Sequence, residues 1–189
     1  MNENERLITL IAGCPWLMDA LRAARAVGAP QWVIGAGALR DLVFEHLHGR
    51  AAPPPRDIDY AFFDLDDVSV EHELAVENQL RALRPGLPFE ARNQARVHLW
   101  YEQHFGYPIE PYRSIEHAVA TWPETATAVA CRLREDDGIE LIAPLGLDDL
   151  LAGVLRRNPA QVTTEIFRQR LARRPDLAKR WPNVQIVFD

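Results

Sequence analysis

The chain has 189 residues, of which 48% are hydrophobic and 25% charged, and its formal net charge is −6. This is the composition of an ordinary soluble protein, and the length allows one domain that buries a core without disulfides. No apolar stretch approaches the ~20 residues that cross a bilayer, and the N-terminus lacks the basic start of a signal peptide. Because Cys14 and Cys131 match no metal or redox spacing, we expect buried thiols, a cytoplasmic protein and no membrane partner.

Charge is unevenly distributed along the chain. Residues 151–189 carry eight Arg or Lys against three acids, a net charge of +5, so the first 150 residues carry −11. A basic C-terminal segment could contact a phosphate-bearing partner. It could equally be the charged surface of helices that face an acidic body, which is the simpler interpretation.

The first half of the chain predicts helices that alternate with strands. Pro15 suits the first turn of a helix and Gly28 suits its end, and Asp67 or Ser69 can cap another helix. Three successive prolines before Arg56 predict an extended loop. In chain order we expect a helix at 5–12, a helix at 15–26, a strand at 31–34, a helix at 39–48, a strand at 57–63 and a helix at 70–84.

The second half predicts the rest of a mixed sheet and a helical end. The turn at 135–138 joins two strands as a hairpin. In chain order we expect a strand at 89–100, a helix at 114–120, strands at 126–133 and 139–142, a helix opening at 146 and a helix at 163–173. These elements predict an α+β (α/β) fold in a single domain, 1–189, with a core at 1–143 and a helical C-terminal segment at 144–189.

An acidic pair on the strand at 57–63 is the strongest chemical signal. Side chains two apart on a strand lie on the same face, so Asp57 and Asp59 stand side by side while Ile58 points to the core. Two such carboxylates repel each other, and Mg²⁺ or Mn²⁺ would neutralise them through oxygen ligands. Alone, the pair is weak evidence, because solvent-facing strands also carry it by chance.

A glycine turn, Gly35-Ala36-Gly37, opens the helix upstream of the acidic pair. Such a turn lets backbone N–H groups approach phosphates, and a helix N-terminus favours anions. Arg40 could bind a phosphate or brace the acidic pair. The turn is neither a dinucleotide fingerprint, because Arg40 stands at the third glycine position, nor a P-loop. Together the turn and the pair supply the phosphate cradle and metal site that phosphoryl transfer needs.

The segments VIGAGALRDLVFEHL and RDIDYAFFD resemble the signature of the polymerase-beta-like nucleotidyltransferase superfamily, in particular the start of tRNA nucleotidyltransferases and poly(A) polymerases. Nearly the whole chain is similar to a family of small bacterial nucleotidyltransferase-like proteins. The resemblance implies a mixed central sheet flanked by helices, and Mg²⁺-dependent transfer of a nucleotidyl group from an NTP to an acceptor hydroxyl. Ala36 departs from the commoner pattern, which has Gly or Ser there.

The resemblance also implies a third carboxylate on a later strand. Glu90 is the candidate, although the superfamily commonly has Asp; it would help hold a metal and could accept the proton of the acceptor hydroxyl. Asn93 and Arg96 lie in a stretch that resembles the small bacterial family and are candidate contacts to phosphate or acceptor.

The sequence is therefore compatible with three functions. The favoured one is a metal-dependent nucleotidyltransferase in which Asp57, Asp59 and Glu90 hold the metal and Gly35, Ala36, Gly37, Arg40, Asn93 and Arg96 bind the NTP. The second is a catalytically weak nucleotide-binding or regulatory module that lacks a working third carboxylate. The third is an RNA-acting nucleotidyltransferase, which the basic C-terminal segment would support. The acidic first 150 residues favour a small-molecule or protein acceptor over RNA.

Overall fold

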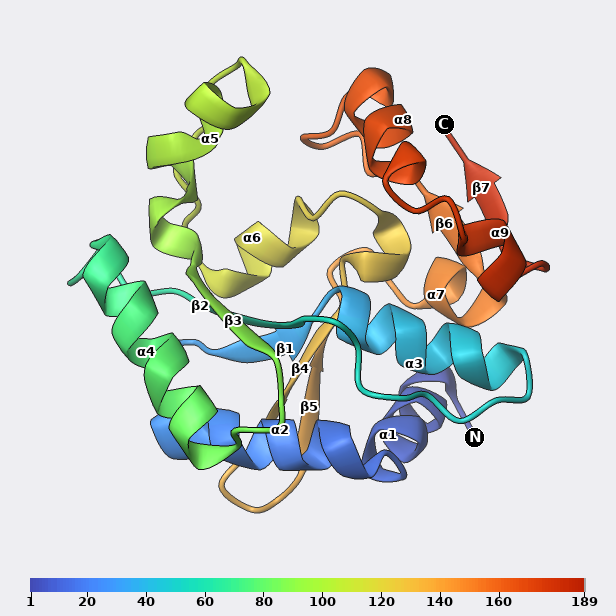
Figure 1. Cartoon of the computed structure of the whole chain (residues 1–189), viewed down its shortest axis with the longest axis horizontal. Coiled ribbons are helices and arrows are strands. Elements are labelled where there is room, and N and C mark those ends of the chain that lie inside the picture. Colours follow the sequence, from blue (N-terminus) through green and yellow to red (C-terminus); the bar gives the residue numbers. More distant parts are fainter. Residues whose placement is uncertain (189) are drawn as a thin grey trace.

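A five-stranded mixed sheet forms the centre of the computed structural model, which describes residues 1–188 (Figure 1). The strand order is β3-β2-β1-β4-β5, with β2 and β3 parallel and the other neighbours antiparallel. The strands of this sheet are β1 (Val33–Gly35), β2 (Ile58–Phe62), β3 (Phe89–Asn93), β4 (Ala130–Leu133) and β5 (Ile139–Ile142). A second, two-stranded parallel sheet joins β6 (Val154–Arg156) and β7 (Gln185–Val187).

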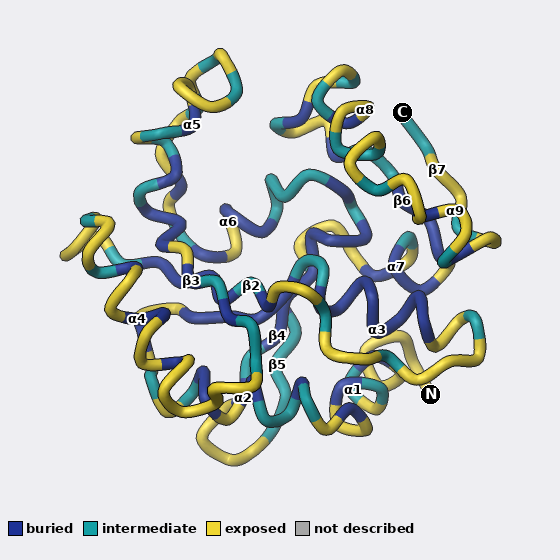
Figure 2. Tube along the Cα trace, in the orientation of Figure 1, coloured by how far each residue is buried: buried dark blue, intermediate teal, exposed yellow. Residues whose placement is uncertain are grey.

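Helices surround the central sheet, which confirms the predicted fold class. Helices α2 and α4 pack against each other, α2 against β4 and α4 against β3. Figure 2 shows buried residues concentrated in the central strands and α3, while the outer ends of α5 and α8 are largely exposed. The helices are α1 (Glu3–Ala12), α2 (Pro15–Val27), α3 (Gly37–Leu47), α4 (Val70–Leu83), α5 (Val97–Phe105), α6 (Ile115–Ala120), α7 (Asp148–Ala152), α8 (Thr164–Ala172) and α9 (Leu177–Arg180).

Alternating side chains of β2 separate two hydrophobic clusters. Ile58 and Tyr60 are fully buried in the larger cluster, together with residues of α1 and α2. Ala61 belongs to the smaller cluster, which contains residues of α6 and α5. Asp57 and Asp59 have the same alternation as Ala61, so the acidic pair lies on the sheet face of the smaller cluster, away from the main core.

The strand predicted at 89–100 is wrong beyond Asn93. There the chain turns through a 3-10 segment, η1 (Gln94–Arg96), into α5. Asn93 ends the strand because its side-chain oxygen accepts a hydrogen bond from the N–H of Ala95. The residues that follow bury Val97 and Tyr101, four apart, which is a helical and not a strand pattern.

The other predicted elements are confirmed with shifted ends. Residues 126–133 form a strand only from Ala130, because the 3-10 turn η2 (Thr125–Thr127) precedes it. The C-terminal segment has the predicted helices α7 and α8, and in addition α9, β6 and β7, which the sequence did not predict. Among the described residues no single helix is long and apolar enough to cross a membrane; α1 and α2 pass that test only together, across a 90° bend.

Candidate active site

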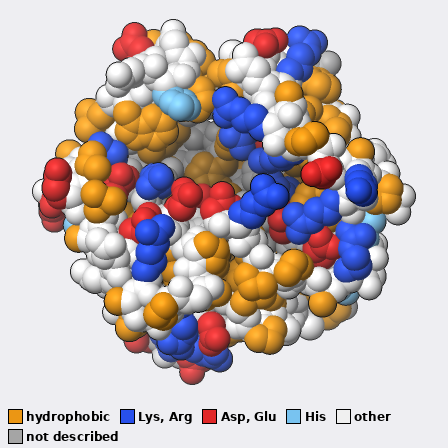
Figure 3. All heavy atoms as spheres, viewed as in Figure 1, with side chains coloured by type: hydrophobic (Ala, Val, Ile, Leu, Met, Phe, Trp, Pro, Cys, Tyr) orange, Lys and Arg blue, Asp and Glu red, His pale blue; other side chains and the backbone are white. Residues whose placement is uncertain are grey.

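A cavity of about 420 Å³ lies over the sheet face that carries the acidic pair. Figure 3 shows this side of the molecule hollowed, with acidic and basic side chains gathered along one edge of the hollow and hydrophobic side chains inside it. Its lining residues come from three regions: Ala36, Gly37 and Arg40 of the glycine turn and α3; Asp57, Asp59, Tyr60, Ala61, Glu90, Arg92 and Gln94 around β2 and β3; and Trp122, Pro123, Glu124, Thr127, Arg170 and Arg174.

Most of the residues that the sequence indicated meet in this cavity. The parallel pairing of β2 and β3 sets Asp59 directly opposite Glu90. Antiparallel pairing of β1 with β2 brings the glycine turn, at the end of β1, beside the start of β2. The acidic pair, Glu90 and Arg40 therefore share the cavity with the N-terminal end of α3.

Asp57, Asp59 and Glu90 form one wall of the cavity, the acidic wall, and their negative charge is not fully compensated by neighbouring cations. Burial, together with the charges of Asp57 and Glu90, raises the pKa of Asp59 to about 6, although Arg40 and Arg92 act in the opposite direction. The carboxylates of Asp57 and Asp59 are hard oxygen donors that fit Mg²⁺ or Mn²⁺, since a cation would offset the repulsion between them. Within residues 1–188, no group of three His, Cys, Asp or Glu side chains is already arranged to hold a metal ion.

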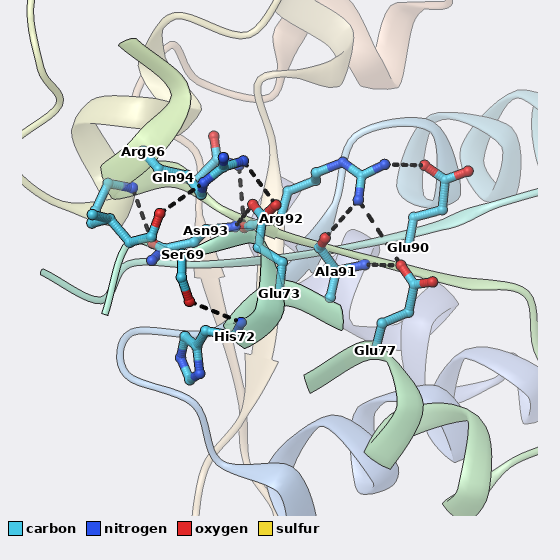
Figure 4. Close-up of polar contacts among 12 residues, drawn as sticks. Ser69, His72, Glu73, Glu77, Glu90, Ala91, Arg92, Asn93, Gln94 and Arg96 are labelled. Carbon is cyan, nitrogen blue, oxygen red and sulfur yellow. Dashed lines mark hydrogen bonds and ion pairs between the residues drawn. The ribbon is translucent and has the colours of Figure 1, made fainter. Parts of the chain in front are cut away.

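The Glu90 side chain points toward Arg92. In this orientation Glu90 does not form a three-residue metal-binding group with Asp57 and Asp59. Its carboxylate lies 3.4 Å from the Arg92 guanidinium, and both side chains are about half exposed (Figure 4). Arg92 also donates to the carbonyl of Ala91 and lies 4.0 Å from Glu77. An exposed ion pair contributes only about 0–1 kcal/mol, so the pairing with Arg92 does little to oppose rotation of Glu90 toward Asp59; the like charges of the acidic pair oppose it until a cation offsets them.

The glycine turn is held by two different constraints. A Cβ on Gly35 would lie 2.6 Å from the carbonyl oxygen of Val129, so β4 approaches too closely for any side chain there. Ala36 has φ 52° and ψ −121°, a backbone conformation that side-chain-bearing residues rarely adopt. Ala36 and Gly37 line the cavity, whereas Gly35 faces β4. The strained turn directs the free N–H groups of the first turn of α3 to this wall.

Arg40 is held in place by the C-terminal segment. Its guanidinium donates to Asp41 at 3.0 and 2.6 Å, and the other oxygen of Asp41 accepts from Arg180 at 2.9 Å. The guanidinium also lies 5.7 Å from the ring centroid of Trp181, which is buried against α3. Arg40 is only 8% exposed, and these contacts place its positive charge on the cavity wall.

The opposite wall was not predicted from the sequence. Glu124 is fully buried and pairs with Arg170 at 3.1 Å and Arg174 at 3.4 Å. Burial alone would raise the pKa of Glu124, but the two guanidinium charges outweigh burial and hold the pKa below its ordinary value. The members of this cluster are far apart along the chain, so no local motif marks them. Together they give the cavity two arginines facing the acidic pair.

Asn158 fixes the segment that precedes Glu124. It is 2% exposed, and its side-chain amide donates to the carbonyls of Ala120 at 2.7 Å and Trp122 at 2.9 Å. Its backbone N–H donates to the carbonyl of Pro123. The loop after β6 therefore positions the tryptophan on the cavity wall.

Asn93 and Arg96 are not brought to the cavity. Asn93 is fully buried. Its side-chain N–H groups donate to the backbone carbonyls of Asp64 and Asp67, and its side-chain oxygen accepts from the N–H of Asp64. Arg96 pairs with Glu73 at 3.0 Å (Figure 4). Both side chains hold the loop after β2, because they donate to backbone carbonyls of that loop: Asn93 to Asp64 and Asp67, and Arg96 to Val68.

A sequence model of the nucleotidyltransferase family matches residues 22–186, which include every wall of the cavity. The chain belongs to this nucleotidyltransferase family. The resemblance in the glycine turn and the acidic pair is thereby confirmed over most of the chain. A comparison with curated proteins gives no significant match.

Solved structures share the nucleotidyltransferase fold. A protein solved by NMR, and described as revealing a CCA-adding enzyme head domain, is 29% identical with a TM-score of 0.83, covering 100% of this chain and 97% of that one. A CCA-adding enzyme with CTP is 19% identical with a TM-score of 0.56, covering 95% of this chain and 43% of that one. The Thermotoga maritima CCA-adding enzyme complexed with tRNA is 20% identical with a TM-score of 0.54, covering 97% and 42%. The chain thus spans less than half of these two enzymes, whose likeness shows the fold alone.

Proposed function

We propose that this nucleotidyltransferase is metal-dependent and moves a nucleotidyl group from an NTP to the hydroxyl of a small-molecule or protein acceptor. One observation carries the proposal: the acidic pair, the strained glycine turn and two arginines, Arg170 and Arg174, line the same cavity. Positioning and charge neutralisation are the main requirements of phosphoryl transfer, and these walls supply both.

Each wall has a role in this reaction. Asp57 and Asp59 hold Mg²⁺ or Mn²⁺, which when bound neutralises charge on the triphosphate. The first turn of α3 and Arg40 bind phosphate oxygens from one side. Arg170 and Arg174 line the same cavity and bind further phosphate oxygens.

The transfer step forms one bond and breaks one. The acceptor oxygen bonds the α-phosphorus, and the bond from this phosphorus to the oxygen bridging to the β-phosphate breaks. Pyrophosphate leaves with that electron pair, in line with the attack. Glu90 turns from Arg92 and accepts the hydroxyl proton, since it lies opposite Asp59 in the sheet register.

The orientation of Glu90 also supports a second candidate, a nucleotide-binding module without transfer activity. In that protein Glu90 would stay paired with Arg92. Glu90→Gln separates the two: a transferase should lose about 10²–10³-fold in rate while NTP affinity changes little. A binding module has no rate to lose.

RNA is the less favoured acceptor because many cations of the basic C-terminal segment, residues 151–189, form ion pairs within the protein. Several of its arginines pair with carboxylates of the body: Arg156 with Asp149, Arg170 and Arg174 with Glu124, and Arg180 with Asp41 and Glu45. Steeply salt-dependent binding of tRNA, with transfer to its 3′ end, would overturn this preference.

The decisive experiment is a calorimetric titration of each NTP with Mg²⁺ or Mn²⁺. It compares the wild type with Asp57→Asn/Asp59→Asn, and with a control, Asp66→Asn/Asp148→Asn, that removes two exposed carboxylates away from the cavity. We expect metal-dependent NTP binding in the wild type and the control and none in the first variant. Absence of NTP binding by the wild type would refute the proposal.

A further inference from the structure

A second cavity, of about 230 Å³, adjoins the first between α5 and the α8 region. The two cavities share five wall residues: Arg92, Gln94, Trp122, Pro123 and Arg170. The walls that belong to the second cavity alone are mainly aromatic and aliphatic, among them Val97, Trp100, Tyr101, Phe105, Tyr112 and Ile166. Hydrophobic side chains inside the hollow of Figure 3 agree with this lining.

The tyrosine hydroxyls at and beside this cavity already have hydrogen-bond partners. Tyr112 donates to the side-chain oxygen of Gln161 at 2.8 Å, Tyr107 donates to the backbone carbonyl of the same residue, and the hydroxyls of Tyr101 and Tyr107 lie 3.1 Å apart. An occupant therefore meets ring faces and aliphatic carbon more than free donors. Such a lining favours an uncharged, planar, apolar group over a sugar or a phosphate.

The cationic groups at its mouth are also paired. Arg92 lies 3.4 Å from Glu90, and Arg170 lies 3.1 Å from Glu124. A nucleic acid acceptor needs cations that follow its phosphates, and the second cavity offers only these two residues among its walls. Its chemistry fits a small molecule better.

The two cavities differ in the way that the two substrates of the reaction differ. The first is lined by carboxylates and arginines and suits a metal-bound triphosphate. The second meets it at Trp122, whose carbonyl is fixed by Asn158. A group seated in the second cavity would present its hydroxyl across the shared wall, where the acceptor must approach the α-phosphate.

We infer that the second cavity is the acceptor site and that it binds an aromatic system of one or two rings, whose hydroxyl becomes nucleotidylated. This inference rests on the proposed function. A volume of about 230 Å³ lies below the ~300–1,000 Å³ of sites for drug-sized ligands, which limits the occupant to one or two rings. The hydroxyl oxygen gains the α-phosphorus, pyrophosphate leaves and Glu90 takes the proton, as in the transfer step above.

The test measures binding of two probes, 2-naphthol and methyl glucoside, and separately of Mg²⁺-NTP. The variant Ile166→Trp enlarges a side chain that lines the second cavity and does not line the first. Its matched control is Leu99→Trp, at a position that is 59% exposed on α5 and lines neither cavity. We expect the wild type and the control to bind 2-naphthol and not methyl glucoside. Ile166→Trp should weaken naphthol binding at least about tenfold and leave NTP affinity within about twofold.

Each of the other outcomes refutes the acceptor role, and one of them refutes the proposed function as well. Naphthol binding that is absent, or unchanged in Ile166→Trp, would refute the aromatic acceptor site while NTP binding still supports the proposed function. Loss of NTP affinity in Ile166→Trp would assign the second cavity to the nucleobase and refute the acceptor role. Naphthol binding by a wild type that binds no NTP would refute the proposed function, and the acceptor role with it.

Discussion

Asp59 and Glu124 line the same cavity from opposite walls, and their surroundings shift their pKa in opposite directions. Burial and two neighbouring carboxylates raise the pKa of Asp59 to about 6. Two guanidinium groups hold the pKa of Glu124 below its ordinary value despite complete burial. The acidic wall is thus built one positive charge short, which suits a cation, while Glu124 offsets only one of the two arginine charges on the other wall and orients both guanidiniums.

The largest expected effect is on the acidic wall. Asp59→Asn should lower the transfer rate by about 10²–10³-fold, because it removes a proposed metal ligand. The same change should stabilise the ligand-free protein by about 1–2 kcal/mol at pH 8, since it removes a buried, repelled charge. Urea denaturation of both proteins, in the absence of metal, measures this difference.

The pH dependence follows from the raised pKa of Asp59. Between about pH 4 and pH 6 the folded wild type binds a proton that the unfolded chain has lost, so its stability falls as pH rises through this window. The stability difference between wild type and Asp59→Asn should therefore be small near pH 4 and complete above about pH 6. A difference that does not change between these pH values would contradict the electrostatic account.

The opposite wall should respond in the opposite sense. Glu124→Gln should destabilise the fold by about 3 kcal/mol, because it leaves two arginines without their partner, and should also weaken NTP binding. Because the pKa of Glu124 is lowered, its contribution is present above its unfolded pKa and is lost as pH falls toward the folded pKa. Glu165→Gln, which loosens an exposed pair with Arg168 at 3.9 Å, is the control and should change stability by less than about 0.5 kcal/mol. Equal stability of Glu124→Gln and wild type would show that this wall is not held by its ion pairs.

The two glycines of the turn should separate folding from binding. Gly35→Ala should cost about 1–3 kcal/mol of stability, because its Cβ would lie 2.6 Å from the Val129 carbonyl. Gly37→Ala meets nothing closer than Arg40 at 3.6 Å, so it should fold normally and weaken NTP binding by narrowing the cavity. Thermal unfolding and NTP titration on both variants check this, and a reversed pattern would exchange the roles assigned to the two glycines.

The smallest effect is expected at the turn between them. Ala36→Gly relieves a backbone conformation with φ 52°, and should stabilise the protein by about 1 kcal/mol or less after the greater flexibility of unfolded glycine is counted. Thermal unfolding measures it. A lower unfolding temperature would mean that the Ala36 side chain contributes packing that outweighs the strain.

The acidic wall could be predicted from the sequence because its parts are local. The glycine turn, Arg40, Asp57 and Asp59 lie within one strand–helix–strand unit, where alternation and helix-start signals determine direction. Ile58 was expected in the core and is fully buried. The fold class could be predicted for the same reason, since most elements carry their own periodicity.

The opposite wall could not be predicted because its contacts join segments far apart. Glu124 and Arg170 have no shared motif, and β6 and β7 have three residues each, too few for a period. Asn93 and Arg96 were expected to contact the ligand, yet both bond Glu73, a residue far away in the sequence, and neither lines the cavity. The first residues of α5, 97–100, were predicted to continue a strand because their apolar and aromatic side chains suit either structure, and only the turn at Asn93 decides between them.

The contact of Glu124 with Arg170 and Arg174 also sets an order of events on the ribosome. The central strands and the acidic wall precede α8 in the chain and leave the exit tunnel before α8 does, since synthesis proceeds at about 5–20 residues per second. Until α8 emerges, a buried Glu124 would have neither arginine, so the loop that bears it gains nothing by docking early. The nascent chain therefore completes its cavity last, and a truncated product that lacks α8 would carry the acidic pair without Arg170 on the cavity wall.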